Sequence, residues 1–148
     1  MKHFKINIIN RIIDANINRA KEGLRVCEEI TRFILSNRTL TESLKRLRHK
    51  IGAEPLKNPG QKSGLLKVRC SLGDVGFGIK LKSEFKRSRL ENIFFANMSR
   101  VKESIRVLEE FSKLSDVKAA LQFKKIRYEA YEIEKKVAEK LIRLLGHE

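Results

Sequence analysis

Apolar side chains recur at helical spacing along most of the chain. Between residues 9 and 35 they step by three, four and seven positions, which predicts one long amphipathic helix. The same spacing predicts a second helix at about 40–51, a third that begins near residue 88, and a fourth from about residue 115 to the C-terminus. Thr39, Ser88 and Ser115 are the expected caps of these helices, because their hydroxyl oxygens can accept from free backbone N–H groups. The chain is therefore predicted to be all-α.

The segment between the two helix pairs, residues 52–87, differs in composition. It holds both prolines and six of the eight glycines, together with many lysines. A short strand or hairpin is a candidate at residues 65–70 (LLKVRC) and 79–82 (IKLK). The apolar residues within it argue that this long connection packs onto the helices, and connections of this length are usually either functional or disordered. The single domain thus divides into residues 1–51, 52–87 and 88–148.

The first and third helices repeat one another. Residues 14–33 align with residues 95–114 at an offset of 81, without a gap, and nine of the 20 positions are identical. Chance gives about one or two identities at ordinary residue frequencies. The identical pairs are Ala15/Ala96, Asn16/Asn97, Arg19/Arg100, Lys21/Lys102, Glu22/Glu103, Arg25/Arg106, Val26/Val107, Glu28/Glu109 and Glu29/Glu110.

The repeat extends into the second and fourth helices. With a two-residue gap, LKRLRH at 44–49 matches FKKIRY at 123–128, which pairs Arg48 with Arg127. The repeated unit is therefore a helix hairpin. Two such hairpins bury their apolar faces against each other, so the predicted fold is a four-helix bundle with a pseudo-twofold axis and a long Gly/Lys-rich connecting loop.

One repeated pair is polar but lies on the apolar side of its helix. At 100° per residue, Asn16 falls among the apolar positions of the first helix, and Asn97 does the same on the third. A buried amide needs hydrogen-bond partners. One interpretation is a structural bond, such as Asn16 to Asn97 across the axis, and the other is contact with a ligand inside the bundle.

Charged residues are also kept in phase by the repeat. They are Arg19, Glu22, Arg25 and Glu29, which recur as Arg100, Glu103, Arg106 and Glu110. Solvated pairs four residues apart, worth about 0.2–0.5 kcal/mol each, explain one such helix. They do not explain why both copies keep the same charges. A ligand-binding surface does, with arginine for phosphate and carboxylate for a metal or an amino group.

The connecting loop contains a second candidate site, GDVGFG at 73–78. Gly73 and Gly76 allow backbone N–H groups to approach a phosphate closely. Asp74 is the only acidic residue between Glu54 and Glu84, so it is the candidate ligand for Mg²⁺ beside phosphates. A tight turn is the alternative interpretation of this hexapeptide. Tyr128 and Tyr131 on the fourth helix are further candidates, for stacking on a base-like ring, with core or rim packing as the alternative.

Composition narrows the class of protein and of ligand. With 33 basic and 18 acidic residues the net charge is +15, which attracts nucleic acid, nucleotides or phosphorylated metabolites. No apolar run reaches the roughly 18 residues of a membrane span. The two cysteines form no metal-binding motif. The basic N-terminus is interpreted as the lead-in to the first helix rather than a signal peptide, so a cytoplasmic protein without a membrane partner is expected.

Several of these segments together resemble a known family. They are IIDANINRAKEGLRVCEEITRFIL, LRH at 47–49, GDVG at 73–76, and ANMSRVKESIRVLEEFSKL with IRYEAY. The family is the helical domain found at the N-terminus of some bacterial thiamine-phosphate synthases, and sometimes alone, which is associated with a second type of hydroxymethylpyrimidine-phosphate kinase. The resemblance covers nearly the whole chain. It implies phosphoryl transfer from ATP, with Mg²⁺, to a phosphorylated small molecule, 4-amino-5-hydroxymethyl-2-methylpyrimidine phosphate.

The resemblance also implies a set of site residues. The expected catalytic residues are Arg19, Arg25, Arg100, Arg106 and Asp74, of which Asp74 is also the expected metal ligand. The expected substrate-binding residues are Asn16, Asn97, Glu22, Glu29, Glu103, Glu110, Arg48, Arg69, Gly73, Gly76, Arg127 and Tyr128. The residue after Arg69 is often acidic in the family, whereas it is Cys70 here.

Two other functions fit the sequence. A helical protein that binds nucleic acid without catalysis agrees with the charge, although the repeated surface mixes glutamate with arginine and carries no nucleic-acid motif. An accessory or oligomerisation module of a thiamine-phosphate synthase is the third hypothesis. A homodimer is compatible with each, and the pattern leaves open which half of the repeat forms an active site.

Overall fold

Helices make up most of the chain. The computed structural model describes residues 2–53, 59–82 and 87–146. The α-helices are α1 Lys2–Glu29, α2 Arg38–Ala53, α3 Pro59–Val68, α4 Leu90–Ser112 and α5 Val117–Leu145, and a π-helical segment η1, Ile30–Ile34, continues α1. No strand occurs within the three described ranges, which confirms the all-α prediction. Both candidate strands, at 65–70 and 79–82, are therefore wrong. Residues 65–68 form the last turn of α3, and residues 79–82 form no strand.

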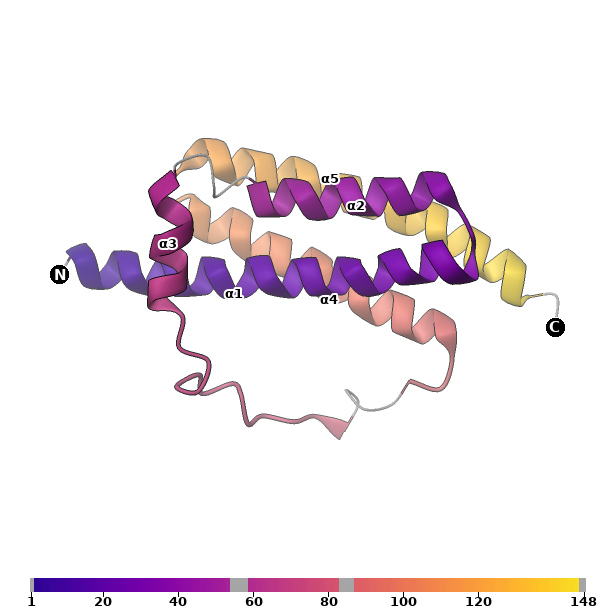
Figure 1. The fold of residues 1–148 in the computed structure, drawn as a ribbon, viewed down its shortest axis with the longest axis horizontal. Coiled ribbons are helices and arrows are strands. Elements are labelled where there is room, and N and C mark those ends of the chain that lie inside the picture. Colours follow the sequence, from indigo (N-terminus) through magenta and orange to yellow (C-terminus); the bar gives the residue numbers. More distant parts are fainter. Residues whose placement is uncertain (1, 54–58, 83–86, 147–148) are drawn as a thin grey trace.

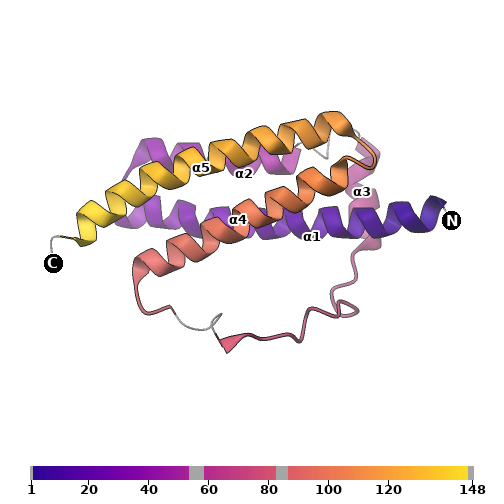
Figure 2. The same ribbon diagram turned by 180° about the vertical axis from the view of Figure 1, so that it is seen from behind.

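The four long helices form a bundle in which neighbouring helices are antiparallel (Figure 1). α1 contacts α2 and α4, and α5 contacts the same two helices from the opposite corner. Seen from behind, the α4–α5 hairpin lies across the α1–α2 hairpin (Figure 2). α3 packs across α1. The arrangement of two similar hairpins confirms the four-helix bundle predicted from the repeat.

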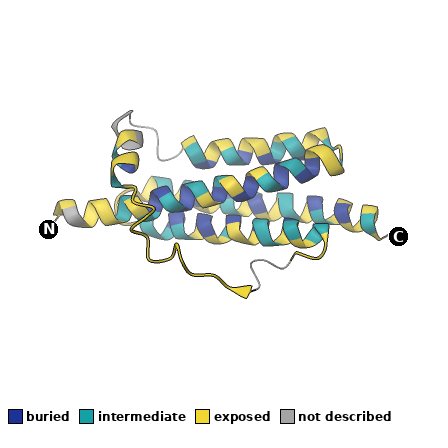
Figure 3. Cartoon of the chain, turned by 60° about the horizontal axis from the view of Figure 1, so that its bottom comes forward, coloured by how far each residue is buried: buried dark blue, intermediate teal, exposed yellow. Residues whose placement is uncertain are grey.

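Large apolar side chains from all four helices fill the space between them. Leu24, Leu44, Phe94 and Phe123 are each at most 1% exposed. Burying a side chain of this size stabilises the fold by about 1.5–3 kcal/mol relative to leaving it in water. In Figure 3 the buried positions form stripes on the facing sides of the helices, while the outer sides are exposed.

α1 and α4 approach each other closely where they cross. A Cβ atom on Gly23 would lie 2.8 Å from Val101 Cγ2 and 3.0 Å from the Asn97 carbonyl oxygen, so only glycine allows this separation. One turn further along α1, Cys27 Sγ lies 3.9 Å from the Phe94 carbonyl oxygen. Burial raises the pKa of the Cys27 thiol to about 12, and the negative charge of Glu134 adds to the effect.

The structure corrects two of the predicted helix caps. Asn37, and not Thr39, caps α2, since its Oδ1 accepts from the backbone N–H of Leu40 at 2.9 Å. Asp116, and not Ser115, caps α5, since its Oδ1 accepts from the backbone N–H of Ala119 at 3.0 Å. Each is an amide or carboxylate within two residues of the predicted hydroxyl, and its oxygen accepts from a free N–H group in the first turn of the helix.

The third predicted cap is wrong as well. Arg89 occupies the cap position of α4, with no side-chain capping bond. Ser88 lies one residue earlier, and its hydroxyl oxygen accepts from Asn92 Nδ2 at 3.3 Å. The bond joins two side chains, so it leaves the free backbone N–H groups of the first turn of α4 without a side-chain partner.

The connection between α2 and α4 packs against the bundle through α3, where Leu65 joins the hydrophobic core. Beyond α3, Val75, Phe77 and Ile79 are 93%, 73% and 66% exposed, so the expectation that the apolar residues of this connection pack onto the helices is wrong for them. The loop runs below α1 and α4, on the side away from α2 and α5 (Figure 1). Among the described residues, no helix is both long enough and apolar enough to cross a membrane.

Candidate functional site

A buried glutamate joins the two helices of each hairpin. In the first hairpin, Arg48 Nε on α2 donates to Glu28 Oε2 on α1 at 3.0 Å. In the second, Arg127 Nε on α5 donates to Glu109 Oε2 on α4, also at 3.0 Å. Both glutamates are only 4% exposed. The repeated residues thus form the same contact twice.

A second arginine contacts each glutamate from its own helix. Arg25 Nη1 lies 3.4 Å from Glu28 Oε1, and Arg106 Nη1 lies 3.3 Å from Glu109 Oε1. We call these sets the Glu28 clamp (Arg25, Glu28, Arg48) and the Glu109 clamp (Arg106, Glu109, Arg127). A buried carboxylate is costly without such partners. The clamps therefore explain structurally why one part of the charged pattern repeats.

The second clamp extends further than the first. Glu110 Oε1 lies 3.0 Å from Arg106 Nη2 and 2.7 Å from Lys113 Nζ. The hydrogen bond from Lys113, with the nearby charge of Arg106, lowers the pKa of Glu110 despite some desolvation. Desolvation opposes the charge on Arg127, but its interactions with Glu109 and Tyr131 outweigh this and raise its pKa. Arg127 is therefore a permanent cation at this position.

Five other repeated charges have no such structural role. Arg19, Glu22, Arg100 and Glu103 are exposed. Within the part of the chain that the structure describes, none of them forms a hydrogen bond or an ion pair, and half-buried Glu29 forms none either. An exposed charge without an intramolecular partner adds little to stability. These residues carry the part of the repeat that a ligand would explain.

The two asparagines satisfy their amide groups locally. Asn16 Nδ2 donates to the Ile12 carbonyl oxygen, and Asn97 Nδ2 donates to the Ile93 carbonyl oxygen, each at 2.8 Å. Both bonds reach back four residues along the same helix, so they do not join α1 to α4. The expected bond across the axis is replaced by two equivalent bonds within the helices. Asn16 is 5% exposed and Asn97 is half-buried.

A pocket of about 560 Å³ lies between α4 and α5, beside the Glu109 clamp. Its lining residues are Ser99, Lys102, Glu103, Arg106, Arg127 and Tyr131. Lys102 Nζ lies 2.7 Å from Glu134 Oε2 and 5.1 Å from the centre of the Tyr131 ring. The guanidinium of Arg127 lies 6.0 Å from the same ring centre. Cations beside an aromatic ring suit an anionic ligand that carries a flat ring.

The corresponding positions in the first hairpin lack these rings. In the register that pairs Arg48 with Arg127, His49 stands where Tyr128 does, and Gly52 where Tyr131 does. A Cβ on Gly52 would lie 3.6 Å from Lys21 Nζ, so the lysine covers the position of the missing ring. Of the two clamps, which both lie in the described chain, the Glu109 clamp alone has a pocket beside it in which an aromatic ring, that of Tyr131, accompanies the cations.

Arg69 and Asp74 lie apart from both clamps. Arg69 at the end of α3 makes two hydrogen bonds to buried Asp14 on α1, Nε to Oδ2 at 2.8 Å and Nη2 to Oδ1 at 2.7 Å. These bonds raise the pKa of Arg69. Asp74 Oδ1 accepts from the Gly76 backbone N–H at 2.8 Å, which closes a tight turn. Gly73, like Gly76, is exposed in this turn.

The described residues contain no group of three or more His, Cys, Asp or Glu side chains that could hold a metal ion. Asp74 is exposed and contributes one carboxylate, which is already bonded to its own turn. A single carboxylate can join a Mg²⁺ ion that phosphates already hold, but it does not make a resident magnesium site. The structure therefore offers no preformed metal centre within these ranges.

The structure brings together some of the sequence-predicted residues and separates others. Those at or beside the α4–α5 pocket are Glu103, Arg106, Glu110, Arg127 and Tyr128. Sequence reasoning chose Glu22 and Glu29 with their copies but missed Glu28 and Glu109, which are the buried acids. Both were among the nine identities, and both lie next to apolar positions in helical phase. Lys102, also a repeated residue, was missed in the same way.

The chain is similar in sequence to several thiamine-phosphate synthases. The chain is 38% identical over 142 residues to a thiamine-phosphate synthase from Rhodopirellula baltica, which covers 93% of this chain and 37% of that protein. It is 40% identical over 126 residues to a thiamine-phosphate synthase from Synechocystis, with 85% and 35% covered. The chain thus spans little more than a third of these relatives. No solved structure matches it. Residues 11–136 match the ThiD2 family, and the chain therefore belongs to this family.

Proposed function

We propose that this protein acts in thiamine biosynthesis and transfers a phosphoryl group from ATP to 4-amino-5-hydroxymethyl-2-methylpyrimidine phosphate. The α4–α5 pocket carries this proposal, because it combines cations with an aromatic ring in a member of the ThiD2 family. The substrate has the matching features, a phosphate and a flat aminopyrimidine. The pocket volume of about 560 Å³ lies within the usual range for small-molecule sites.

The chemistry requires charge neutralisation more than proton transfer. An oxygen of the acceptor phosphate attacks the γ-phosphorus of ATP, the bond from that phosphorus to the bridging oxygen breaks, and ADP leaves. The acceptor oxygen is already ionised, so no general base is needed. In this proposal Arg106 and Lys102 hold the acceptor phosphate, and Tyr131 stacks on the pyrimidine. Glu103 is the candidate acceptor for the exocyclic amino group.

Magnesium enters this proposal with the nucleotide. The described residues provide no cluster of metal ligands, and Mg²⁺ commonly binds through substrate phosphates with one or two carboxylates. Asp74 and the unpaired arginines Arg19 and Arg100 remain predicted site residues. All three are exposed, and none of them lines the α4–α5 pocket.

The test compares two equivalent arginines. Arg106→Gln and Arg25→Gln each remove the contact to the clamp glutamate, and Arg106→Gln also removes the ion pair with Glu110. A pair four residues apart on a helix is worth about 0.2–0.5 kcal/mol, so the two variants should differ in stability by no more than about that amount. Only Arg106→Gln should raise the KM for the pyrimidine phosphate, by about tenfold or more, because a hydrogen bond between charged groups is lost. ADP release with ATP, Mg²⁺ and the pyrimidine phosphate is the readout. No ADP release by the unaltered protein at any temperature of its folded range would refute the proposal.

An accessory role is the second candidate. The observation that favours it is the length of the relatives, of which this chain spans 35–37%. In that case the protein would bind a thiamine-phosphate synthase and would not be stabilised by ATP or the pyrimidine phosphate. Size-exclusion chromatography with a purified synthase, beside thermal melting with each ligand, separates the two candidates.

A further inference from the structure

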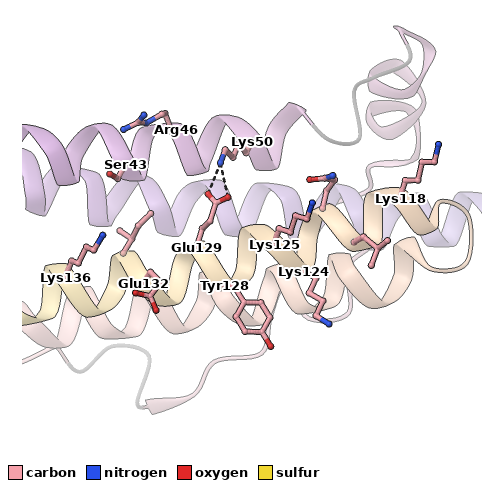
Figure 4. Close-up of a pocket in the computed structure, with 13 residues that line it drawn as sticks. Ser43, Arg46, Lys50, Lys118, Lys124, Lys125, Tyr128, Glu129, Glu132 and Lys136 are labelled. Carbon is pink, nitrogen blue, oxygen red and sulfur yellow. Dashed lines mark hydrogen bonds and ion pairs between the residues drawn. The ribbon is translucent and has the colours of Figure 1, made fainter.

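A larger groove lies between α2 and α5, on the side of the bundle away from α1 and α4. Its volume is about 1100 Å³, and it shares no lining residue with the α4–α5 pocket. Figure 4 shows its side chains along the two antiparallel helices. It exceeds the 300–1,000 Å³ typical of small-ligand pockets, so it has room for an extended ligand. Of the predicted site residues it contains only Tyr128.

The groove is strongly basic, and five of its six cations have no ion-pair partner in the described chain. The basic residues of the lining are Arg46, Lys50, Lys118, Lys124, Lys125 and Lys136, against the acids Glu129 and Glu132. Lys50 Nζ on α2 lies 2.9 and 2.8 Å from the two carboxylate oxygens of Glu129 on α5. Across the described chain, none of the other five cations forms an ion pair. Unpaired cations around a concave surface attract a compact anion with several charges.

The internal repeat also shapes this groove. In the register that pairs Arg48 with Arg127, Lys50 is equivalent to Glu129, and these two residues meet across the groove. Arg46 is equivalent to Lys125 in the same register. The two hairpins therefore place one unpaired cation on each side of the central ion pair. In Figure 4, Lys125 extends toward α2.

We propose that this groove binds the nucleoside triphosphate that donates the phosphoryl group, an inference that rests on the proposed function. The phosphates lie at the end formed by Lys118 and Lys125, and the terminal phosphate extends round α5 to Lys124, which points away from α2 (Figure 4). The base lies at the other end, over the side chain of Ile133 and under the planar guanidinium of Arg46, which stacks on flat rings.

The position of the phosphate end connects the groove with the acceptor pocket. Tyr128 lines the groove and Tyr131 lines the α4–α5 pocket, and their ring centres are 6.1 Å apart. Lys124 and Tyr128 both leave α5 on the side away from α2, opposite to Lys125 (Figure 4). A terminal phosphate at Lys124 is therefore placed at the tyrosine pair, next to the acceptor. Phosphoryl transfer requires such proximity.

Other occupants fit less well. A second copy of the chain carries the same net charge of +15 and would be repelled from a basic groove. A nucleic acid would bind more tightly because of the positive charge. However, Leu121 and Ile133 also line the groove, and a phosphate backbone makes no favourable contact with these apolar side chains. A nucleotide uses both kinds of surface.

The experiment removes two groove cations and compares them with two matched surface lysines. The groove variant is Arg46→Gln with Lys125→Gln. The control is Lys45→Gln with Lys140→Gln, which changes the net charge equally on the same two helices, at exposed positions outside the groove. ATP binding with Mg²⁺ is measured by calorimetry, without the acceptor. The groove variant should bind ATP about tenfold or more weakly, whereas the control should change less than about twofold.

Steady-state kinetics separate this inference from the proposed function. The groove variant should raise the KM for ATP and leave the KM for the pyrimidine phosphate unchanged, while Arg106→Gln should do the reverse. Normal ATP binding in the groove variant would overturn the groove assignment and leave phosphoryl transfer intact. Loss of ATP binding only in the groove variant, with no ADP release by the unaltered protein, would support the groove and refute the transfer.

Competing ligands test the chemistry of the occupant. Inorganic triphosphate should compete with ATP but bind more weakly, because it lacks the base. Equal affinity for the two would overturn the base position at Ile133 and Arg46. A short single-stranded RNA that occupies the groove at concentrations where ATP does not would show that the surface binds nucleic acid, and the inference would be wrong.

Discussion

Neutralising one buried glutamate at a time tests the equivalence of the two clamps. Glu28→Gln and Glu109→Gln keep the side-chain shape but remove the charge. The carboxylates are 5% and 6% exposed, and their partners Arg48 and Arg127 are 14% and 13% exposed. Each substitution leaves a largely buried arginine without its counterion, which by itself costs about 3–5 kcal/mol. The glutamine oxygen still accepts a hydrogen bond, and the arginines reach some water, so we expect about 2–3 kcal/mol for each.

Urea denaturation followed by circular dichroism measures this loss. In a domain of this size, 2–3 kcal/mol corresponds to a fall in Tm of roughly 5–10 °C. The two variants should agree within about 0.5 kcal/mol, since the clamp distances agree within 0.1 Å. Glu22→Gln and Glu103→Gln are the controls, because these exposed glutamates have no partner in the described chain and should change stability by less than about 0.5 kcal/mol.

A double-mutant cycle identifies the partner of each glutamate. Arg48→Met combined with Glu28→Gln should show an interaction energy of about 1–3 kcal/mol, because the two side chains are in contact. Arg127→Met combined with Glu28→Gln should be additive, because these residues belong to different clamps. The clamp interpretation is refuted if either glutamate variant loses less than about 1 kcal/mol, or if both cycles give the same coupling.

Three further predictions concern the fold. Gly23→Ala should lower the free energy of unfolding by about 1–3 kcal/mol, because the added methyl group would overlap with α4. Gly64→Ala has no atom within 4 Å of the added methyl group and should raise the free energy of unfolding by about 0.5–1 kcal/mol, and urea titrations measure both changes. Asp116→Ala should lower the free energy of unfolding by about 0.5–2 kcal/mol through loss of the α5 cap, and an unchanged urea midpoint would contradict this. A thiol reagent at pH 8 should modify exposed Cys70 and spare Cys27, whose pKa burial raises to about 12. Equal reaction of both thiols in the native protein would contradict the burial argument. The stability that the neutral Cys27 thiol contributes is complete below its unfolded pKa of 9.0 and is lost as the pH rises toward 12.

The fold could be predicted from sequence because its information is redundant. Apolar spacing defines four helices, and the repeat shows that they form two equivalent hairpins, so each line of reasoning supports the other. Cap positions were not predictable in the same way. At both corrected caps with a side-chain bond, two residues with suitable oxygens stand close together, Asn37 near Thr39 and Asp116 beside Ser115. The choice between them depends on where the turn places each oxygen.

The site could be predicted only in part, because repetition does not distinguish two reasons for keeping a charge. Glu28 and Glu29 are neighbours and both repeat, but a rotation of 100° buries one and leaves the other half-exposed. Sequence reasoning selected Glu29. Only the structure shows that Glu28 binds Arg48 across the hairpin. The α2–α5 groove was missed because its lysines lie in no motif and gather only when α2 and α5 pack together.

Comparison of equivalent positions in the two hairpins distinguishes residues that the fold requires from residues that a ligand requires. Each hairpin needs its own clamp, because a buried glutamate links its two helices, and so the clamp is present in both copies. A ligand site needs to form only once. The positions where the copies differ are therefore informative, and Tyr131 in place of Gly52 adds a ring beside a cation that both copies keep. Gly52→Tyr would test this directly. If the ring were the only missing element, the substitution would create a second binding site for the pyrimidine phosphate, and a stoichiometry that stays at one site per chain would show that other residues of the second hairpin are also needed.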